Sequence, residues 1–460
     1  MRTFTLTLAV LAFVACNKDK DVGPATAGDS GTTVGDDDDD TTGVGDDDDT
    51  TVGDDDDDTP DGIRFDAHIV GEALGARYAA VGDLDGDGID EIVVSAWNDI
   101  TKADIPYGWV QIWSYGGDLD TWNRVDALGT NALIRSPNQP ALGDIDNDGD
   151  LDIVVGFGSR YCEVIPAIGQ CGGLVVLEND NGTWNRYVQV ENSLFYYRGI
   201  DLADIDGDGN LDVVTVSERY TFQEREAFVQ LLSGTGTPNF SPPVQIGQGL
   251  GPFPSIVDVD GDGDLDVMGG EQGTGESFSW LENDGGDFTK HLIFDNLGNG
   301  NMIRLIPDLY GDGVTRGLAS NHTNTETPKK ANPDIYDSQL VAFEIPSDAT
   351  QEWLSYDVLS EGILPTPDLG LFPNDAPGTF DVGDADGDGD NDILLAGDGD
   401  PTVYLLDQVA PGDFVTRVLR NNVYGNGGTW MTDFTGDGAV EFVVTSYGSD
   451  QVFVIERVAN

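Results

Sequence analysis

The sequence predicts an all-β fold, a seven-bladed β-propeller of four-stranded blades, from three observations. An acidic nine-residue motif recurs along the chain, short apolar segments flank each copy, and glycine is abundant, with 61 residues. Short β-branched runs between turn residues are typical of strands, and no segment has the apolar period of a long amphipathic helix. Recurrence at a fixed period indicates stacked supersecondary units.

The acidic motif sets the number of units. Five complete copies start at Asp83, Asp144, Asp204, Asp258 and Asp384, and two degraded copies start at Asp308 and Asp433. The starts are about 58 residues apart on average, which is a reasonable length for one repeated unit. The chain is therefore predicted to contain seven such units within residues 62–460.

Each unit supplies four strand-like segments. In the first unit, Tyr78–Val81 precedes the acidic loop, and Ile92–Val94, Trp109–Trp113 and Trp122–Leu128 follow it. Four-stranded sheets of this kind are arranged radially around a channel in a propeller.

The two ends of this region predict how the ring closes. The last unit ends at Val452–Asn460 and lacks a fourth strand, whereas the strand-like segment Ile63–Val70 precedes the first unit. We expect this N-terminal strand to complete the last blade. The alternative is an open array with two exposed edges, which invites edge-to-edge aggregation.

The acidic loops predict calcium sites. In the complete copies, acids occupy positions 1, 3, 5 and 9, and glycine occupies position 6. Alternate acids in a tight loop turn their oxygens to one centre, and Ca²⁺ takes six to eight oxygen ligands. The loop differs from an EF-hand, which has Glu at position 12 and flanking helices. A solvated turn would explain one copy but not five with the same spacing.

The degraded copies predict weaker sites. In the fifth copy Tyr310 stands at position 3 and Arg316 at position 9, and a cation there opposes metal binding, so we expect that loop to be empty. In the seventh copy Thr435 replaces the third acid, whereas Asp433, Asp437 and Glu441 remain. That site is expected to be weak or partly filled.

These loops, set between strands in a sevenfold repeat, resemble the FG-GAP/VCBS repeats of integrin-α-like propellers over about residues 63–460. The resemblance implies that each loop joins the first and second strands of a blade, on the lower face, with a structural and adhesive role. It implies about five calcium sites, with these ligands: Asp83, Asp85, Asp87 and Glu91; Asp144, Asp146, Asp148 and Asp152; Asp204, Asp206, Asp208 and Asp212; Asp258, Asp260, Asp262 and Asp266; Asp384, Asp386, Asp388 and Asp392.

The N-terminus predicts export. Residues 1–16 read as a signal peptide, in which Arg2 precedes an apolar run, Phe4–Ala15, that is too short for a stable membrane anchor. Leu11–Cys16 resembles a bacterial lipoprotein processing site, although Phe13 stands where that pattern prefers leucine, which implies a lipid on Cys16. The alternative is an ordinary secretory peptide cleaved nearby. Asn17 after the cysteine implies the outer membrane or cell surface, with a periplasmic or secreted protein as the alternative.

Residues 17–61 are predicted to form a disordered tether. They carry three aspartate runs, Asp36–Asp40, Asp46–Asp49 and Asp54–Asp58, and like charges keep a chain extended. A loosely calcium-absorbing tract is the other reading. The whole chain has 85 acidic and 21 basic residues, a net charge of −64, which excludes nucleic acid as a partner and leaves the lipid anchor as its contact with a membrane.

The longer loops, one of which contains the two remaining cysteines, are expected to lie on the face opposite the calcium loops. Cys162 and Cys171 are expected to form a disulfide, with two free thiols as the alternative. Loops of variable length on that face are where recognition usually occurs. The candidates for contact with a protein or glycan ligand are Trp97, Tyr107, Tyr161, Tyr220, His322 and Tyr336.

The sequence predicts a binding, adhesion or scaffold module and not an enzyme. The three histidines, His68, His291 and His322, are scattered, and no nucleophile or metalloprotease motif occurs. Two alternatives remain open. One is a carbohydrate-binding propeller, and the other is a polysaccharide-active hydrolase or lyase, since two carboxylates suffice for glycoside hydrolysis.

Overall fold

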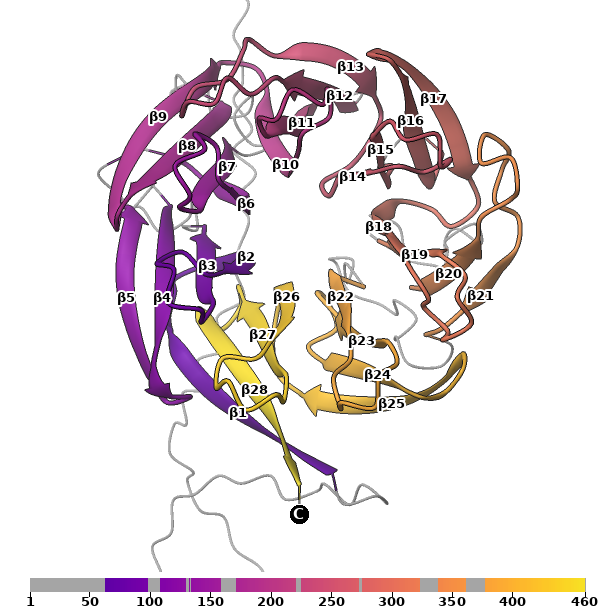
Figure 1. The fold of residues 1–460 in the computed structure, drawn as a ribbon. Helices are drawn as coiled ribbons and strands as arrows, with labels where there is room; N and C mark the ends of the chain where they lie inside the picture. Colours follow the sequence, from indigo (N-terminus) through magenta and orange to yellow (C-terminus); the bar gives the residue numbers. More distant parts are fainter. Residues whose placement is uncertain are drawn as a thin grey trace, which may run out of the picture. The chain divides into compact units, whose positions relative to one another are not determined.

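The computed structural model describes residues 63–97, 108–129, 132, 134–158, 171–220, 225–272, 275–322, 338–360 and 377–459. Within these ranges the regular structure is 28 β-strands in seven antiparallel four-stranded sheets, which are arranged in a ring (Figure 1). The predicted all-β, seven-bladed propeller is confirmed. Among the same residues, no helix is both long and apolar enough to cross a bilayer.

The first four blades are given from the innermost strand outward. Blade 1 contains β2 (Ala76–Gly82), β3 (Glu91–Ala96), β4 (Trp109–Asp118) and β5 (Thr121–Leu128). Blade 2 contains β6 (Pro137–Gly143), β7 (Asp152–Gly158), β8 (Gly172–Asp180) and β9 (Thr183–Asn192). Blade 3 contains β10 (Tyr196–Ala203), β11 (Asp212–Tyr220), β12 (Arg225–Leu232) and β13 (Val244–Gln248). Blade 4 contains β14 (Ser255–Val257), β15 (Asp266–Gly270), β16 (Phe278–Asp284) and β17 (Asp287–Phe294).

The other three blades follow in the same order. Blade 5 contains β18 (Gly300–Ile306), β19 (Arg316–Asn321), β20 (Leu340–Glu344) and β21 (Tyr356–Val358). Blade 6 contains β22 (Phe380–Gly383), β23 (Asp392–Ala396), β24 (Val403–Ala410) and β25 (Asp413–Arg420). Blade 7 contains β26 (Asn426–Thr432), β27 (Glu441–Ser446), β28 (Gln451–Ala459) and, as its outermost strand, β1 (Ile63–Glu72).

Strand β1 closes the ring as predicted. It pairs antiparallel with β28, from Ile63 opposite Ala459 to Glu72 opposite Gln451. The first and last strands of the described chain therefore share one sheet, which leaves no open gap between blade 7 and blade 1.

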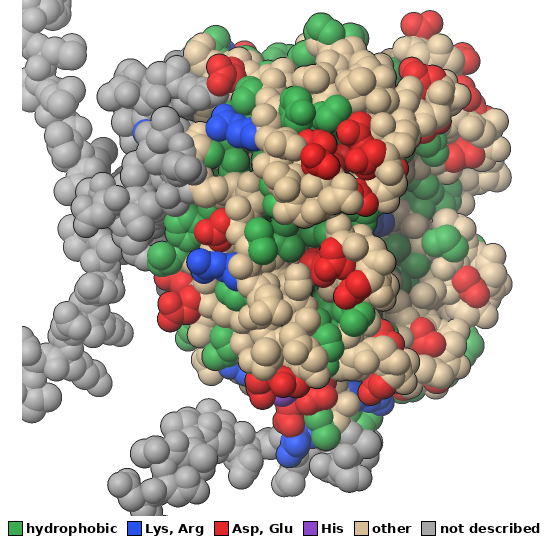
Figure 2. All heavy atoms as spheres, turned by 60° about the vertical axis from the view of Figure 1, so that its left-hand side comes forward, with side chains coloured by type: hydrophobic (Ala, Val, Ile, Leu, Met, Phe, Trp, Pro, Cys, Tyr) green, Lys and Arg blue, Asp and Glu red, His purple; other side chains and the backbone are tan. Residues whose placement is uncertain are grey.

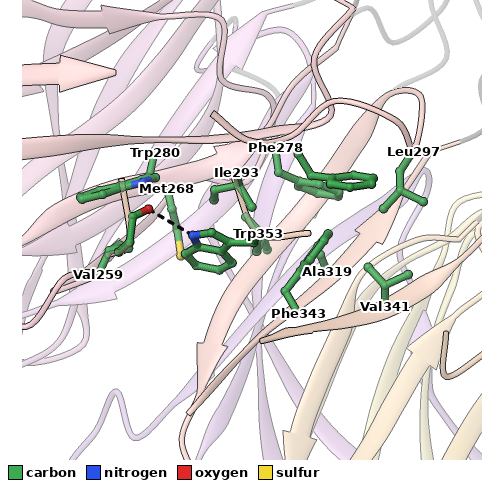
Figure 3. Close-up of a cluster of buried hydrophobic side chains, with 13 residues drawn as sticks. Val259, Met268, Phe278, Trp280, Ile293, Leu297, Ala319, Val341, Phe343 and Trp353 are labelled. Carbon is green, nitrogen blue, oxygen red and sulfur yellow. Dashed lines mark hydrogen bonds between the residues drawn. The ribbon is translucent and has the colours of Figure 1, made fainter. Parts of the chain in front are cut away.

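The core lies between neighbouring blades. The second strands, such as β3 and β27, are buried along their whole length, whereas the outermost strand β5 is exposed over most of its length. Figure 3 shows the cluster that joins blades 4 and 5, in which the rings of Phe278 and Phe343 are 6.0 Å apart. Burying one such side chain stabilises the fold by about 1.5–3 kcal/mol.

Polar side chains also join adjacent blades at or close to their innermost strands. In these contacts a side chain of one blade hydrogen-bonds the backbone of the next blade, which satisfies groups on an otherwise unpaired sheet edge. The pairs are Trp97 Nε1 with Pro137 O, Asn138 Nδ2 with Tyr197 O, Asp201 Oδ2 with Ile256 N, Asn301 Nδ2 with Gly378 O, Asp381 Oδ2 with Met431 N, and Trp430 Nε1 with Ala79 O.

A histidine reinforces the closing strand. His68 is on β1. Its Nδ1 lies 2.8 Å from Oδ1 of Asp120 in blade 1, and its Nε2 lies 3.0 Å from Oε1 of Glu456 on β28. Burial opposes the charged imidazolium, but the hydrogen bonds and charges of these two acids outweigh it and raise the pKa of His68.

The contacts of His68 with Asp120 and Glu456, here called the His68 clasp, predict a pH-dependent contribution to the free energy of unfolding. Because the pKa of His68 is higher in the folded state than in the unfolded state, its contribution is complete below about pH 6.5 and is lost as the pH rises through the folded-state pKa. In thermal melts at fixed calcium, we expect His68→Gln to lower the melting temperature more at pH 6 than at pH 8. An equal loss at both pH values would contradict the clasp.

Candidate metal centres and axial pocket

The acidic loops connect the first and second strands of every blade. The loop 83–91, for example, follows β2 and ends at the first residue of β3, and the other six occupy equivalent places. They therefore lie on one face of the ring. Figure 2 shows acidic side chains in separate groups over the surface, with few basic ones among them.

The first acid of each loop stabilises the turn by accepting hydrogen bonds from backbone N–H groups of the same loop. Asp83 accepts hydrogen bonds from Gly86 N at 2.8 Å and from Gly88 N at 2.9 Å. Both glycines have positive φ, of 73° and 88°, a conformation that costs glycine little. The local sequence thus folds the loop around its own carboxylates.

The ninth acid ties the loop to the sheet. Glu91 is 3% exposed, and its Oε2 accepts a hydrogen bond from Leu84 N at 2.8 Å. The same contact, from the backbone N–H of the second loop residue, recurs at Asp152, Asp212, Asp266, Asp392 and Glu441.

Burial raises the pKa of these ninth-position carboxyls. It is the largest effect at Glu91 and Glu441, where the pKa rises to about 7, and the charges of neighbouring loop acids add to it. The pKa of Asp152 rises to about 6 for the same reasons. A cation in the loop would stabilise the charged form of each group.

Several loops gather enough carboxylates to hold a metal ion. In the first four loops, three acids each place ligand oxygens within 4.8 Å of one another: Asp83, Asp85 and Glu91; Asp144, Asp146 and Asp152; Asp204, Asp206 and Asp212; Asp258, Asp260 and Asp262. These belong to the predicted ligand sets. The predicted ligands Asp87 and Asp208 each accept the backbone N–H two residues on, as the triad members Asp148 and Asp262 also do.

The second loop has a further acid that the sequence analysis missed. Glu178, on the third strand of the blade, β8, forms a second triad with Asp146 and Asp148. One oxygen of Asp146 is buried and has no hydrogen-bond partner, so the donor set suits a hard cation. The spacing within the loop gave no signal for Glu178, because β8 is distant in sequence.

The sixth loop is arranged differently. Asp386 lies 3.2 Å from Arg457 Nη1 of β28, and Asp390, which was not predicted as a ligand, has a buried oxygen without a partner. Burial raises the pKa of Asp390 to about 6, and the nearby Asp388 adds to this rise. A metal ion here would compete with an arginine for Asp386.

The fifth loop contains a side-chain cation. Arg316 donates to both oxygens of Asp312, at 2.8 and 2.7 Å, and its guanidinium lies 4.1 Å from the ring centroid of Tyr310. In the seventh loop, Asp433 keeps the turn, accepting from Gly438 N at 2.9 Å. The two degraded loops thus differ: one supplies its own positive charge and the other does not.

A small pocket lies on the axis of the ring. It is lined from several blades, by four aromatic side chains, Tyr78, Phe253, Phe380 and Trp430, and by the polar side chains of Gln139, Arg304, Thr379 and Thr429. Gln139 Oε1 is buried and has no hydrogen-bond partner. Because these residues come from inner strands far apart in sequence, no local motif marked the pocket.

Arginine and tyrosine lie together beside this pocket. Arg77 Nε donates to Tyr78 Oη at 3.2 Å, and its guanidinium lies 4.9 Å from the centroid of the Trp97 ring. Burial raises the pKa of Tyr78, but the charges of Arg77 and Arg198 outweigh burial and leave that pKa below its usual value.

Some predicted ligand contacts can be placed and others cannot. Trp97 packs against Arg77 and Tyr447, and His322 lies 3.4 Å from Asp398. Tyr107, Tyr161, Tyr336, Cys16 and Cys162 lie outside the described residues, as do the predicted signal peptide and tether. Cys171 is disulfide-bonded, and its pairing with Cys162 stays a prediction.

No protein-family model matches the chain, and no curated protein matches it. Among solved structures, it is similar to rhamnogalacturonan lyase YesW, with 16% identity and a TM-score of 0.45, over 85% of this chain and 72% of that one. It is also similar to Bacillus licheniformis rhamnogalacturonan lyase PL11, with 17% identity and a TM-score of 0.43, over 86% and 73%. Membership of the FG-GAP/VCBS family therefore stays a prediction.

The prediction that this chain is not an enzyme is corrected by these structures. Both of those proteins are named as lyases, and the lack of a familiar motif does not exclude catalysis. At this level of identity the similarity concerns the fold and assigns no activity to the chain.

The loop geometry predicts ion binding that a matched pair of variants can test. Asp146→Asn removes an acid shared by two triads, whereas Asp312→Asn changes the loop that holds Arg316. We expect Asp146→Asn to bind one divalent ion fewer by atomic emission spectrometry after dialysis, and Asp312→Asn to bind the wild-type number. Equal counts in all three proteins would contradict the site at the second loop.

The raised pKa values predict that ions leave at acidic pH. Protons compete for Glu91, Asp152 and Glu441, whose pKa values are about 6 to 7 without metal, so ion affinity falls as the pH falls through that range. Protein dialysed at pH 5 is expected to retain fewer ions than protein dialysed at pH 8. The same content at both values would show that these acids do not ligate.

Proposed function

We propose that this protein is a calcium-stabilised propeller of the cell envelope that binds carbohydrate in its axial pocket. The observation that carries the proposal is the buried, unpartnered Oε1 of Gln139 among aromatic side chains on the axis. A buried acceptor without a partner costs about 1–3 kcal/mol, and a ligand hydroxyl would offset that cost.

The pocket suits the two sides of a sugar ring. The apolar C–H face of a sugar can pack against the half-buried ring of Trp430, while its hydroxyls exchange hydrogen bonds with amide and hydroxyl side chains. Gln139, Thr379 and Thr429 supply such groups. A protein-binding surface of adhesive type would instead be expected on a broad exposed face.

Calcium would serve the scaffold and not the ligand. The carboxylate loops connect strands at one end of the blades, and their oxygens suit Ca²⁺ better than Mg²⁺, which demands a stricter octahedron and keeps several waters. Each ion bound only by the folded state contributes about 2.7 kcal/mol at a hundredfold excess over Kd. We therefore assign to calcium the stiffness of the ring.

Attachment to the envelope rests on the N-terminal sequence. The signal-like run, Cys16 and the aspartate tether would place the propeller outside the cytoplasm, at the outer membrane or cell surface. A domain anchored through this tether could capture extracellular carbohydrate and hold it near the cell.

Cleavage of a polysaccharide is a second candidate function, and one observation favours it. Tyr78 lines the pocket, and the arginine charges beside it lower its pKa, which is how a phenol becomes a usable general base. Incubation with polysaccharides would separate the alternatives: a lyase produces an unsaturated product that absorbs in the ultraviolet, a hydrolase produces only new reducing ends, and a binding protein produces neither.

The proposed carbohydrate site predicts a specific loss of affinity. Gln139→Ala is expected to weaken oligosaccharide binding about tenfold, which corresponds to one lost hydrogen bond of about 1.4 kcal/mol, measured by calorimetry on a ligand found with a glycan array. The control is Gln245→Ala, on the exposed strand β13. If both variants bind like the wild type, the ligand is not in the axial pocket.

A further inference from the structure

The axial pocket holds an arginine that has no partner within the part of the chain that the structure describes. Arg304 on β18 lines the pocket, and among the described residues no hydrogen bond or ion pair reaches its guanidinium. Most other arginines of the described chain pair with a carboxylate, including Arg64, Arg124, Arg219, Arg316, Arg417 and Arg457. In a chain with 85 acidic and 21 basic residues, an unpaired arginine on the axis needs an explanation.

Two carboxyls lie within electrostatic range of Arg304 but are occupied elsewhere. Asp201 accepts a hydrogen bond from Ile256 N at 2.7 Å, and Asp381 accepts one from Met431 N at 2.8 Å. Burial raises the pKa of both carboxyls, and the nearby Arg304 only partly offsets this rise. These acids join the inner strands of neighbouring blades and do not form an ion pair with Arg304.

A second arginine, Arg77, also has no ion pair among the described residues, although it does not line the pocket. Arg77 donates through Nε to Tyr78 and is otherwise packed against rings, with its guanidinium 5.3 Å from the centroid of Tyr78 and 5.9 Å from that of Tyr447. Asp398 acts on Arg77 only at longer range and lies 3.4 Å from His322. Aromatic faces leave the edge of a guanidinium available to a ligand.

The remaining charges nearby do not supply the missing anion. Glu218 is fully buried and accepts from Arg225 at 2.6 Å and from Tyr196, with Arg198 at 3.9 Å. Its carboxylate is thus already held by two arginines. The charges that act on Tyr78 have a net positive effect, which its lowered pKa records.

We propose that Arg304 forms a subsite on the propeller axis for an anionic group, a carboxylate or a sulfate, of the carbohydrate ligand. The planar fork of arginine binds either group through two parallel hydrogen bonds, and a partly desolvated site strengthens them. The inference rests on the proposed carbohydrate function and names its substrate class: acidic sugars, such as uronates or sulfated sugars. The negative surface of the protein would repel such ligands elsewhere and leave the axis as their place of binding.

The test compares three oligosaccharides of equal length in calorimetry at fixed calcium: a uronate oligomer, the neutral oligomer made by reducing its carboxyls, and a sulfated oligomer. The wild type is expected to bind at least one anionic oligomer ten times or more tightly than the neutral one. Arg304→Gln is expected to abolish this preference, Arg304→Lys to restore part of it, and Arg186→Gln, on the exposed strand β9, to leave it unchanged. Thermal melts establish that each variant is folded.

The results separate the subsite from the carbohydrate function. Preference for the uronate over the sulfated oligomer, or the reverse, identifies the anion. If neutral and anionic oligomers bind equally, or if Arg304→Gln keeps the wild-type preference, the anion subsite is wrong and the carbohydrate site stands. Inorganic sulfate is tested alone as the opposite case. If the wild type binds sulfate, Arg304→Gln does not, and neither binds any oligosaccharide, the anion subsite is supported and the carbohydrate function is overturned. Absence of both sulfate and oligosaccharide binding would overturn both.

Discussion

The structure depends on a buried carboxylate that recurs where each complete acidic loop meets its sheet. Glu91 and its counterparts accept the backbone N–H at the start of the loop, and Asp152 also accepts Asn179 N from the third strand at 2.8 Å. One side chain therefore fixes the loop, the second strand and the third strand together. Burial makes this acid costly to ionise, and a metal ion would remove that cost. The fifth blade lacks this carboxylate, and Arg316 at the ninth position pairs with Asp312 of its own loop.

The same ring geometry creates the axial pocket. Inner strands have one sheet edge that faces the channel, and their backbone groups must find partners there. Side chains of adjacent blades supply those partners at six of the junctions between blades. Between blades 4 and 5 the backbones pack so closely that a side chain does not fit, since a Cβ on Gly300 would lie 1.9 Å from Ser277 O. The few polar groups left over, Gln139 Oε1 and the Arg304 guanidinium, are notable because their surroundings are otherwise satisfied.

The sequence predicted the blades well because its strongest signals are local and periodic. Seven acidic loops, about 58 residues apart on average, and an unpaired segment at each end predict the blade number and the pairing of β1 with β28. The loop residues that converge on one point were also found, since their spacing alone determines it. Glu178 and Arg457 were missed as contributors because each approaches a loop through tertiary structure that no spacing records, whereas Asp390 lies within the sixth loop at its seventh position, outside the pattern of acids at positions 1, 3, 5 and 9.

The exclusion of enzymatic activity failed for a related physical reason. Motif searches recognise sites built within one turn or one helix, and a propeller builds its axial site from single residues on inner strands that recur once per blade. Tyr78, Gln139 and Arg304 lie on the inner strands of blades 1, 2 and 5, far apart in sequence, and they meet only because the ring closes. Chemistry on such a scaffold leaves no local signature, so the informative observations are a tyrosine with a lowered pKa and polar groups without partners at the axis. The closing strand is thus a condition for the axial pocket as well as for stability, since without it the residues of the pocket would not be held around one centre.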